Sequence, residues 1–335
     1  MFREAAEAPQ VVRRQREMNA SALAALGARL RTTPPRAVVT LARGSSDHAA
    51  TFARYLIETR AGVLTSSASP SIGSVYEATP DLSGSVALAI SQSGRSPDLL
   101  ASARQASARG ALVVAMVNDE SSPLASAADV TLPLHAGAER SVAASKSFIA
   151  SLAATIDLLA AWTQDRALDH TLARLPEVLE QAWSDDWSSA LPILEPASQM
   201  YVVGRGYGLA IAQEAALKLK ETSSLHAEAF SAAEVRHGPM ALLKSGFPVL
   251  LLGQGDESLE SVTDVASDLA RGGAEILSAG VPNAPGIVLP VATSDPLLAP
   301  LAEIMSFYRL ANRLAVSRGR NPDHPPHLSK VTETL

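Results

Sequence analysis

The sequence contains no cysteine. Disulfide bonds, thiol nucleophiles and cysteine-ligated zinc are therefore excluded for the 335 residues given. Aromatic residues make up only 4% of the chain, while hydrophobic residues make up 47%, so a core must consist mainly of Ala, Leu, Val and Ile. This composition favours parallel sheets covered by helices over a β-sandwich.

Basic charge and long apolar runs are also scarce. The formal net charge is −6, which argues against a nucleic-acid partner because phosphate backbones attract basic surfaces. No apolar run reaches the roughly 18 residues of a membrane span, and the first ten residues, MFREAAEAPQ, lack an apolar signal region. We therefore expect a cytoplasmic protein with no membrane partner and no nucleic-acid partner.

Apolar runs that precede turns and helical patterns predict an α/β protein. At about 150 residues per domain, the length suggests two domains. Unalternating apolar runs are typical of parallel strands that are buried on both faces. We expect helices at 9–31, 145–163, 168–188, 208–221 and 296–316, and three more that end near 58, 109 and 271. We expect strands at 37–42, 86–90, 111–117, 130–134, 200–203, 248–252, 276–277 and 287–291.

The two halves of the chain align without a gap when one is shifted by 162 positions, the difference between 205 and 43. Matches at equivalent strand, turn and helix positions indicate a duplicated βαβ unit. The shift places 43–44 on 205–206, Gln92 on Gln254, and 108–110 on 270–272.

This repeat predicts five parts of the chain. They are an N-terminal helical segment (1–32), a first domain (33–165), a linking helix (166–195), a second domain (196–318) and a C-terminal tail (319–335).

A Ser-Gln-Ser-Gly turn at 91–94 follows the strand expected at 86–90. Ligands of open α/β sheets lie beyond the carboxyl ends of the strands, and hydroxyl and N–H groups at a helix N-terminus form an anion site. Ser96 and Asp98 can cap the following helix, and Pro97 suits its first turn. An ordinary turn is the alternative, because such a loop alone is a weak signal.

Ser45-Ser46 follows the strand expected at 37–42, so the two loops could converge on one ligand. The equivalent loop of the second half, Gly253-Gln254-Gly255-Asp256, has lost the serines and gained an acid. We therefore expect the phosphate site in the first half alone.

Ionisable residues concentrate between 214 and 240. Lys218 and Glu221 are three positions apart and share a helix face. An exposed salt bridge is the commoner meaning of such a pair, but Glu221 ends the helix where a polar loop begins. The pair is therefore a candidate for chemistry.

Three further ionisable residues of this segment, His226, Glu228 and His237, are candidates for a functional role. His237 stands on a Gly-Pro turn and could transfer protons near neutral pH, or it could be a cation at a helix C-terminus. His226 and Glu228 match no common metal-binding spacing, so we expect structural roles for both and no metal site. The Pro-rich segment 321–330 is either a disordered terminus or a lid.

Seven segments resemble the sugar-isomerase (SIS) domain family, above all the isomerase portion of glucosamine-6-phosphate synthases and the stand-alone deaminases. The resemblance covers nearly the whole chain and implies two tandem SIS domains, each a flavodoxin-like three-layer α/β/α sandwich. The segments are GSSDHA (44–49), SQSG (91–94), AERSVAASK (138–146), EAALKLKE (214–221), HAEAF (226–230), EVRHGP (234–239) and LSK (328–330).

The resemblance implies four catalytic residues and no cofactor. Glu221 would move a proton between C1 and C2, and Lys218 would assist at the sugar hydroxyls. His237 would open the sugar ring and would come from a second subunit, which implies a homodimer. Lys330 would lie in a C-terminal lid. The implied substrate-binding residues are Gly44, Ser45, Ser46, Ser91, Gln92, Ser93, Ser96, Val142, Ala143 and Ser329, with Val142 and Ala143 acting through backbone groups.

The chain departs from the synthase pattern at three points. Ala144 replaces a serine, Arg43 replaces a small residue, and the cysteine that glutamine-dependent synthesis needs is absent. We therefore expect a glucosamine-6-phosphate deaminase, which converts glucosamine 6-phosphate and water to fructose 6-phosphate and ammonia. A phosphosugar aldose–ketose isomerase or a fructosamine-6-phosphate deglycase would use the same residues, while a sugar-phosphate-sensing SIS module would not need all four catalytic groups.

Overall fold

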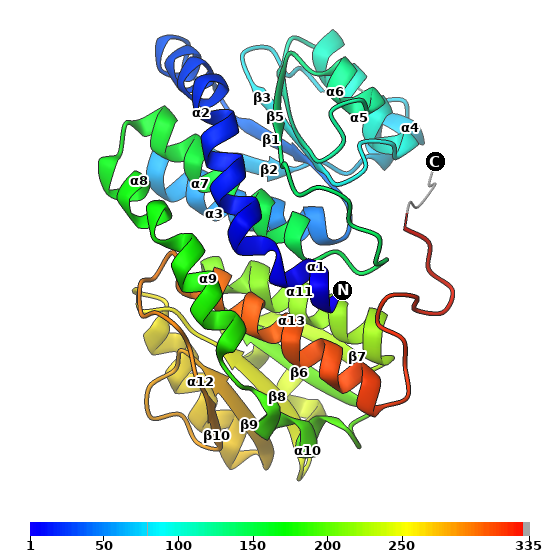
Figure 1. Ribbon diagram of the computed structural model, residues 1–335, viewed down its shortest axis with the longest axis vertical. Helices are drawn as coiled ribbons and strands as arrows, with labels where there is room; N and C mark the ends of the chain where they lie inside the picture. Colours follow the sequence, from blue (N-terminus) through cyan, green and yellow to red (C-terminus); the bar gives the residue numbers. More distant parts are fainter. Residues whose placement is uncertain (79, 331–335) are drawn as a thin grey trace. The chain divides into compact units, whose positions relative to one another are not determined.

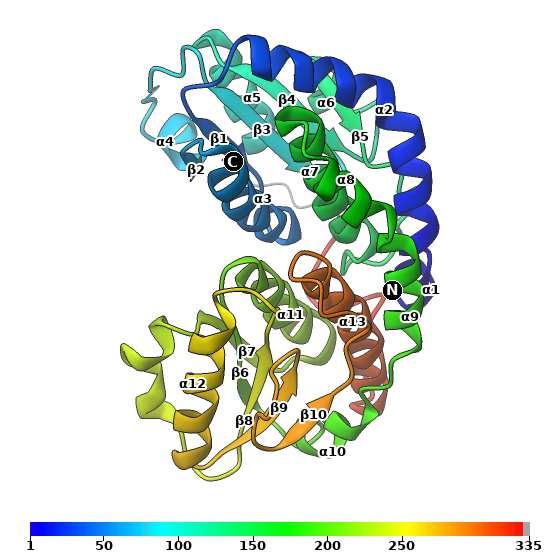
Figure 2. The same cartoon turned by 90° about the vertical axis from the view of Figure 1, so that its left-hand side faces the viewer.

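The computed structural model describes residues 1–78 and 80–330, in two compact units (Figures 1 and 2). Unit 1 contains residues 1–9, 140–145 and 174–328, and unit 2 contains residues 10–139, 146–173 and 329–330. Each unit is a parallel sheet with helices on both faces, which confirms the expected α/β class and three-layer architecture.

The sheet of unit 2 has the strand order β2-β1-β3-β4-β5, with every pair parallel. All six residues of β3 are buried, because helices cover both faces of this central strand. The strands are β1 (Val38–Leu41), β2 (Thr65–Ser67), β3 (Val86–Ser91), β4 (Leu112–Val117) and β5 (Val130–Pro133). The helices are α2 (Ala8–Thr32), α3 (Ser45–Ala61), α4 (Ser71–Ser74), α5 (Pro97–Ala108), α6 (Pro123–Ala127), α7 (Lys146–Thr163) and α8 (Arg166–Ala173).

The sheet of unit 1 has the order β10-β9-β8-β6-β7 and is also parallel throughout. One face packs against α12, and α11 and α13 pack together on the other face. The strands are β6 (Gln199–Gly204), β7 (His226–Ser231), β8 (Phe247–Leu252), β9 (Ala274–Ala279) and β10 (Ile287–Leu289). The helices are α1 (Phe2–Ala6), α9 (Leu175–Ser184), α10 (Leu191–Leu194), α11 (Tyr207–Ser223), α12 (Leu259–Arg271) and α13 (Ala299–Ser317), with 3-10 turns η1 (Ser188–Ala190), η2 (Glu234–Arg236) and η3 (Pro239–Leu242).

The internal repeat is confirmed at the level of single residues. Adding 162 to the bounds of α3 and β4 gives the bounds of α11 and β9. Gly44 (φ 55°, ψ −130°) and Gly206 (φ 58°, ψ −128°) precede α3 and α11 with the same backbone conformation. Glycine suits both positions because its missing Cβ permits positive φ. The two sheets also share one strand order, with β6 equivalent to β1.

The structure corrects the expected elements at three places. The expected helix at 168–188 is two helices, α8 and α9, and the second begins beside Pro176, which lacks the N–H that a continuous helix needs. The strand β2 was missed because it has only three residues, two of them exposed serines. The strand β7 was missed because its ionisable residues hid an edge strand that pairs with β6.

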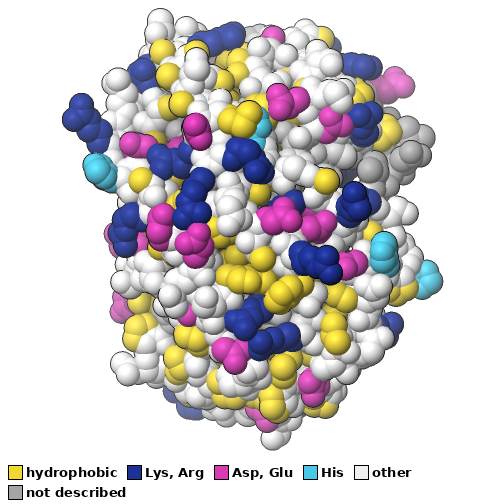
Figure 3. Space-filling view, viewed as in Figure 1, with side chains coloured by type: hydrophobic (Ala, Val, Ile, Leu, Met, Phe, Trp, Pro, Cys, Tyr) yellow, Lys and Arg dark blue, Asp and Glu magenta, His cyan; other side chains and the backbone are white. Residues whose placement is uncertain are grey.

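Within residues 1–78 and 80–330, no helix is both long enough and apolar enough to cross a bilayer. On the face shown in Figure 3, basic and acidic side chains are interspersed. That face therefore carries no extended patch of a single charge.

Candidate functional site

In unit 2, the Ser-Gln-Ser-Gly segment forms a tight turn between β3 and α5. Ser91 ends β3, and its Oγ accepts a hydrogen bond from the Gly94 N–H at 3.0 Å. Ser93 Oγ accepts one from the Arg95 N–H at 3.4 Å. Gly94 has φ 62°, and a Cβ added there would lie 2.7 Å from Ser122 Cβ. Glycine is therefore required in this turn both for its conformation and for its size.

The start of α5 partly differs from the expected cap. Pro97 takes the first helical position and Ser96 the N-cap position, as expected, but the Ser96 side chain makes no capping hydrogen bond. Asp98 does accept one N–H of the first turn of α5. Its buried carboxylate contacts Arg43 Nε at 2.9 Å and accepts the Leu99 N–H at 2.8 Å. A side chain from the preceding loop therefore satisfies this carboxylate.

The loop after β1 lies beside the loop after β3. The two strands are neighbours, with Leu41 opposite Ala89, so both loops leave the same edge of the sheet. Ser45 and Ser46 form the start of α3 and are half-buried. The Arg43–Asp98 ion pair joins the two loops directly. The two serine-bearing loops therefore lie next to each other at one edge of the sheet.

In unit 1, the equivalent loop is closed by its own side chains. Gln254 Nε2 donates to the Arg205 carbonyl and to Ser258 Oγ, each at 2.8 Å. Asp256 Oδ1 accepts from Ser258 Oγ at 2.5 Å and from the Ser258 N–H at 2.9 Å. A carboxylate of the loop thus takes the hydroxyl and the N–H of Ser258, the N-cap residue of α12.

The Lys218–Glu221 pair of unit 1 lies in a buried cluster, unlike an ordinary surface salt bridge. Lys218 is 1% exposed, and its Nζ contacts Glu221 Oε2 at 2.5 Å and Glu214 Oε1 at 3.5 Å. Tyr308 on α13 donates its hydroxyl to Glu214 at 3.2 Å. The Glu221 side chain is 16% exposed, whereas the Glu214 side chain is fully buried. Of these two carboxylates, only that of Glu221 reaches the surface.

Glu214 was not singled out from the sequence. A signal was present, because Glu214 stands four positions before Lys218 and therefore shares its helix face. Whether the pair would be buried could not be deduced, because burial comes from packing of α11 against α13.

His237 lies where η2 ends, followed by Gly238 with φ 131°, so the expected sharp turn is present. The His237 side chain is exposed and makes no hydrogen bond or ion pair within the part of the chain described. His226 and Glu228 are exposed on β7. Among residues 1–78 and 80–330, no three His, Asp or Glu side chains form a metal-binding group.

The segment expected to meet the sugar through its backbone contacts the C-terminal tail within unit 1. The Val142 N–H donates to the Asp323 carbonyl at 3.2 Å, and Ser141 Oγ donates to Asp323 Oδ1 at 2.7 Å. Ala143 is buried and Ala144 is half-buried. The tail near Asp323 is therefore held against residues 141–142 by hydrogen bonds.

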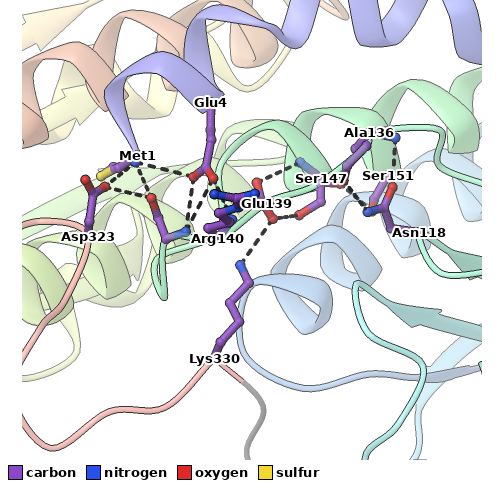
Figure 4. Close-up of polar contacts among 12 residues, drawn as sticks. Met1, Glu4, Asn118, Ala136, Glu139, Arg140, Ser147, Ser151, Asp323 and Lys330 are labelled. Carbon is purple, nitrogen blue, oxygen red and sulfur yellow. Dashed lines mark hydrogen bonds and ion pairs between the residues drawn. The ribbon is translucent and has the colours of Figure 1, made fainter.

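Lys330 has a defined partner in unit 2. Its Nζ contacts Glu139 Oε2 at 3.4 Å (Figure 4). Glu139 is held against the start of α7. Its carboxylate accepts hydrogen bonds from the Ser147 hydroxyl at 2.6 Å and from the Ser147 N–H at 3.3 Å. Ser329 is exposed. The end of the expected lid, 331–335, lies outside the described residues.

A sequence model of the SIS domain matches residues 33–161 and 193–281. The isomerizing glutamine–fructose-6-phosphate aminotransferase of Aeropyrum pernix is 36% identical over 308 residues, which are 86% of this chain and 49% of that protein. The Zymomonas mobilis enzyme of the same name is 34% identical over 88% of this chain and 51% of its own length. The chain thus spans about half the length of these curated relatives.

Two solved structures resemble the whole chain. A Silicibacter pomeroyi protein, provisionally described as a phosphosugar isomerase, has a TM-score of 0.92 and 41% identity, covering 96% of this chain and 99% of its own. The C-terminal domain of the Francisella tularensis glucosamine-fructose-6-phosphate aminotransferase has a TM-score of 0.85 at 24% identity, covering 96% and 97%. The second likeness bears on the fold alone.

Proposed function

The chain belongs to the SIS domain family, and from that membership we propose that it is an enzyme of phosphorylated sugars, specifically a glucosamine-6-phosphate deaminase. The reaction converts glucosamine 6-phosphate and water to fructose 6-phosphate and ammonia. The observation that carries the proposal is the Glu214–Lys218–Glu221 cluster on α11. Burying a lysine costs free energy that a structural surface pair would not require.

The cluster suits a proton transfer between two neighbouring carbons. In the proposed reaction, Glu221 removes the proton from C2 of the open-chain amino sugar and returns it to C1. Together with the passage of a second proton from the C2 amine nitrogen to the C1 oxygen, this step converts the C1 aldehyde to an alcohol and the C2 amine to an imine. Lys218 stabilises the negative charge that develops on oxygen during the transfer. Water then hydrolyses the imine, which leaves the C2 ketone and releases ammonia.

The loops of unit 2 suit the phosphate group. Ser46 and the serines of the turn at 91–94 bring hydroxyl groups to one sheet edge. In the loop around Gln254, the Ser258 hydroxyl and N–H both donate to Asp256. We assign phosphate binding to unit 2 and proton transfer to α11.

His237 and Lys330 take the remaining proposed roles. The exposed, unpaired side chain of His237 supports ring opening in the active site of a second subunit, and hence a homodimer. Lys330, held by Glu139, would lie against the open-chain sugar as part of the C-terminal tail.

A phosphosugar aldose–ketose isomerase is the second candidate. The protein that is 41% identical to this chain over nearly its full length carries that provisional description. The same proton transfer, applied to a sugar with a C2 hydroxyl, interconverts an aldose and a ketose without releasing ammonia.

Product analysis separates the candidates. Purified protein is incubated with glucosamine 6-phosphate, and ammonia and fructose 6-phosphate are measured together. The proposal predicts equal amounts of both products from wild-type protein. Turnover of aldose or ketose phosphates without ammonia from the amino sugar would favour the isomerase, turnover of fructosamine 6-phosphate alone would favour the deglycase, and binding without turnover would favour a sensor.

A further inference from the structure

Arg43 connects two loops at the carboxyl edge of the unit 2 sheet. It lies between β1 and α3, and its Nε and Nη2 contact Asp98 Oδ2 at 2.9 and 2.8 Å. Asp98 is the second residue of α5 and follows the N-cap Ser96 by two positions. The guanidinium is therefore fixed beside the helix turn that follows the Ser-Gln-Ser-Gly segment.

The ion pair leaves part of the guanidinium available. The Asp98 side chain is 2% exposed, and its other oxygen accepts the Leu99 N–H. The Arg43 side chain is 54% exposed, and Nη1 makes no hydrogen bond among the described residues. A guanidinium has five N–H donors in a rigid fork. A pair with one carboxylate oxygen leaves the Nη1 edge free to bind a second anion.

A phosphate ester at this edge would need such a cation. A phosphate monoester carries a charge of about −1.5 to −2 at neutral pH, while the serine hydroxyls and backbone N–H groups of the turn are neutral. The turn carries one arginine of its own, Arg95, which pairs with Asp119 at 2.8 Å. That pair is 50% and 36% exposed, and exposed pairs hold their geometry weakly. Arg43 is better positioned because its anchor is buried.

We propose that Arg43 binds the phosphate group of the substrate, that Asp98 positions its guanidinium, and that the pair selects phosphorylated over unphosphorylated sugars. The inference rests on the proposed function, since it assigns a residue of the same phosphate site. Because the synthase pattern has a small residue at position 43, this contact distinguishes the chain from those enzymes. A charge-assisted bond of this kind corresponds to about a 10- to 100-fold change in affinity.

Binding measurements by isothermal titration test the inference without relying on turnover. Fructose 6-phosphate, inorganic phosphate and fructose are titrated into wild-type protein and into Arg43→Met. We expect the variant to bind fructose 6-phosphate about 10- to 100-fold more weakly, to lose affinity for phosphate, and to bind fructose as wild type does. Arg54→Met removes an exposed arginine of α3, the helix that follows Arg43, and should change none of the three affinities.

A second variant distinguishes phosphate binding from simple neutralisation of Asp98. In Arg43→Met/Asp98→Asn the buried carboxylate no longer needs a cation, so folding is preserved while the guanidinium is absent. We expect this double variant to bind fructose 6-phosphate as weakly as Arg43→Met. Wild-type affinity in either variant would overturn the inference. If wild-type protein binds no sugar phosphate at all, the proposed function fails before the inference is reached.

Discussion

Replacing Glu221 with Gln should stop proton transfer while leaving the fold and substrate binding intact. Glutamine matches the shape of glutamate but cannot accept a proton near neutral pH. A positioned general base contributes about 10²- to 10⁴-fold to a rate, so kcat should fall by that factor. At about 1.4 kcal/mol per tenfold change, this corresponds to about 3 to 5 kcal/mol of transition-state stabilisation.

The structure predicts a smaller effect on stability. The variant loses the 2.5 Å contact between Lys218 Nζ and the Glu221 carboxylate, but Glu214 still lies 3.5 Å from the same Nζ. Lys218 therefore keeps one buried counter-ion, and we expect a loss of about 1 to 3 kcal/mol in unfolding free energy. The loss of transition-state stabilisation should exceed the loss of unfolding free energy. Steady-state kinetics measures the first and thermal unfolding measures the second.

Glu228→Gln is the matched control, because Glu228 is an exposed carboxylate of the same unit, on β7. It should change neither kcat nor stability appreciably. Turnover by Glu221→Gln within a few-fold of wild type would refute the assignment of Glu221 as the base. Loss of fructose 6-phosphate binding in a folded variant would also refute it, since a base acts after binding.

Three more predictions concern buried groups. Lys218→Met leaves Glu214 buried without the lysine cation and should lower the unfolding free energy, measured with denaturant, by about 3 to 5 kcal/mol. Replacing the exposed Lys220 with Met should lower it by less than about 0.5 kcal/mol. Gly94→Ala places a Cβ 2.7 Å from a neighbouring side-chain carbon at φ 62°, so titration calorimetry should find sugar-phosphate binding lost. Burial raises the pKa of Asp157 from its ordinary 3.8 to about 6, so between these values the folded chain holds more protons than the unfolded chain. Its contribution to stability should therefore fall by about 3 kcal/mol in all as pH rises from well below 3.8 to well above 6. The unfolding free energy, measured across this pH range, should fall by that much less in Asp157→Asn than in the wild-type protein.

The repeat was predictable from the sequence because its landmarks are local. Two kinds of feature can be recognised from a few residues alone. One is a glycine that must adopt positive φ, as at 44 and 206, and the other is an apolar run that is buried on both faces. Two such landmarks at a constant spacing of 162 positions define equivalent helices and strands. The strand order could then be inferred to repeat, although only the structure gave its register.

Features that depend on packing were not predictable. Glu214 and Asp98 both looked like ordinary acidic residues of a helix, and each is buried against a cation that the fold supplies. The partner of Glu214 is one helical turn away, but its burial requires α13, from much later in the chain. The partner of Asp98 is 55 positions earlier, so no local pattern could identify it.

Solvent deuterium exchange tests the central claim most directly, since it follows the proton itself. Purified protein is incubated in deuterium oxide with fructose 6-phosphate and ammonium ion, which together supply the C2 imine of the reverse reaction, and deuterium at C1 is measured by proton NMR. The account predicts enzyme-dependent incorporation by wild type and none above background by Glu221→Gln, with fructose 6-phosphate still bound by both. Equal incorporation by both proteins, or none by wild-type protein that binds fructose 6-phosphate, would contradict it.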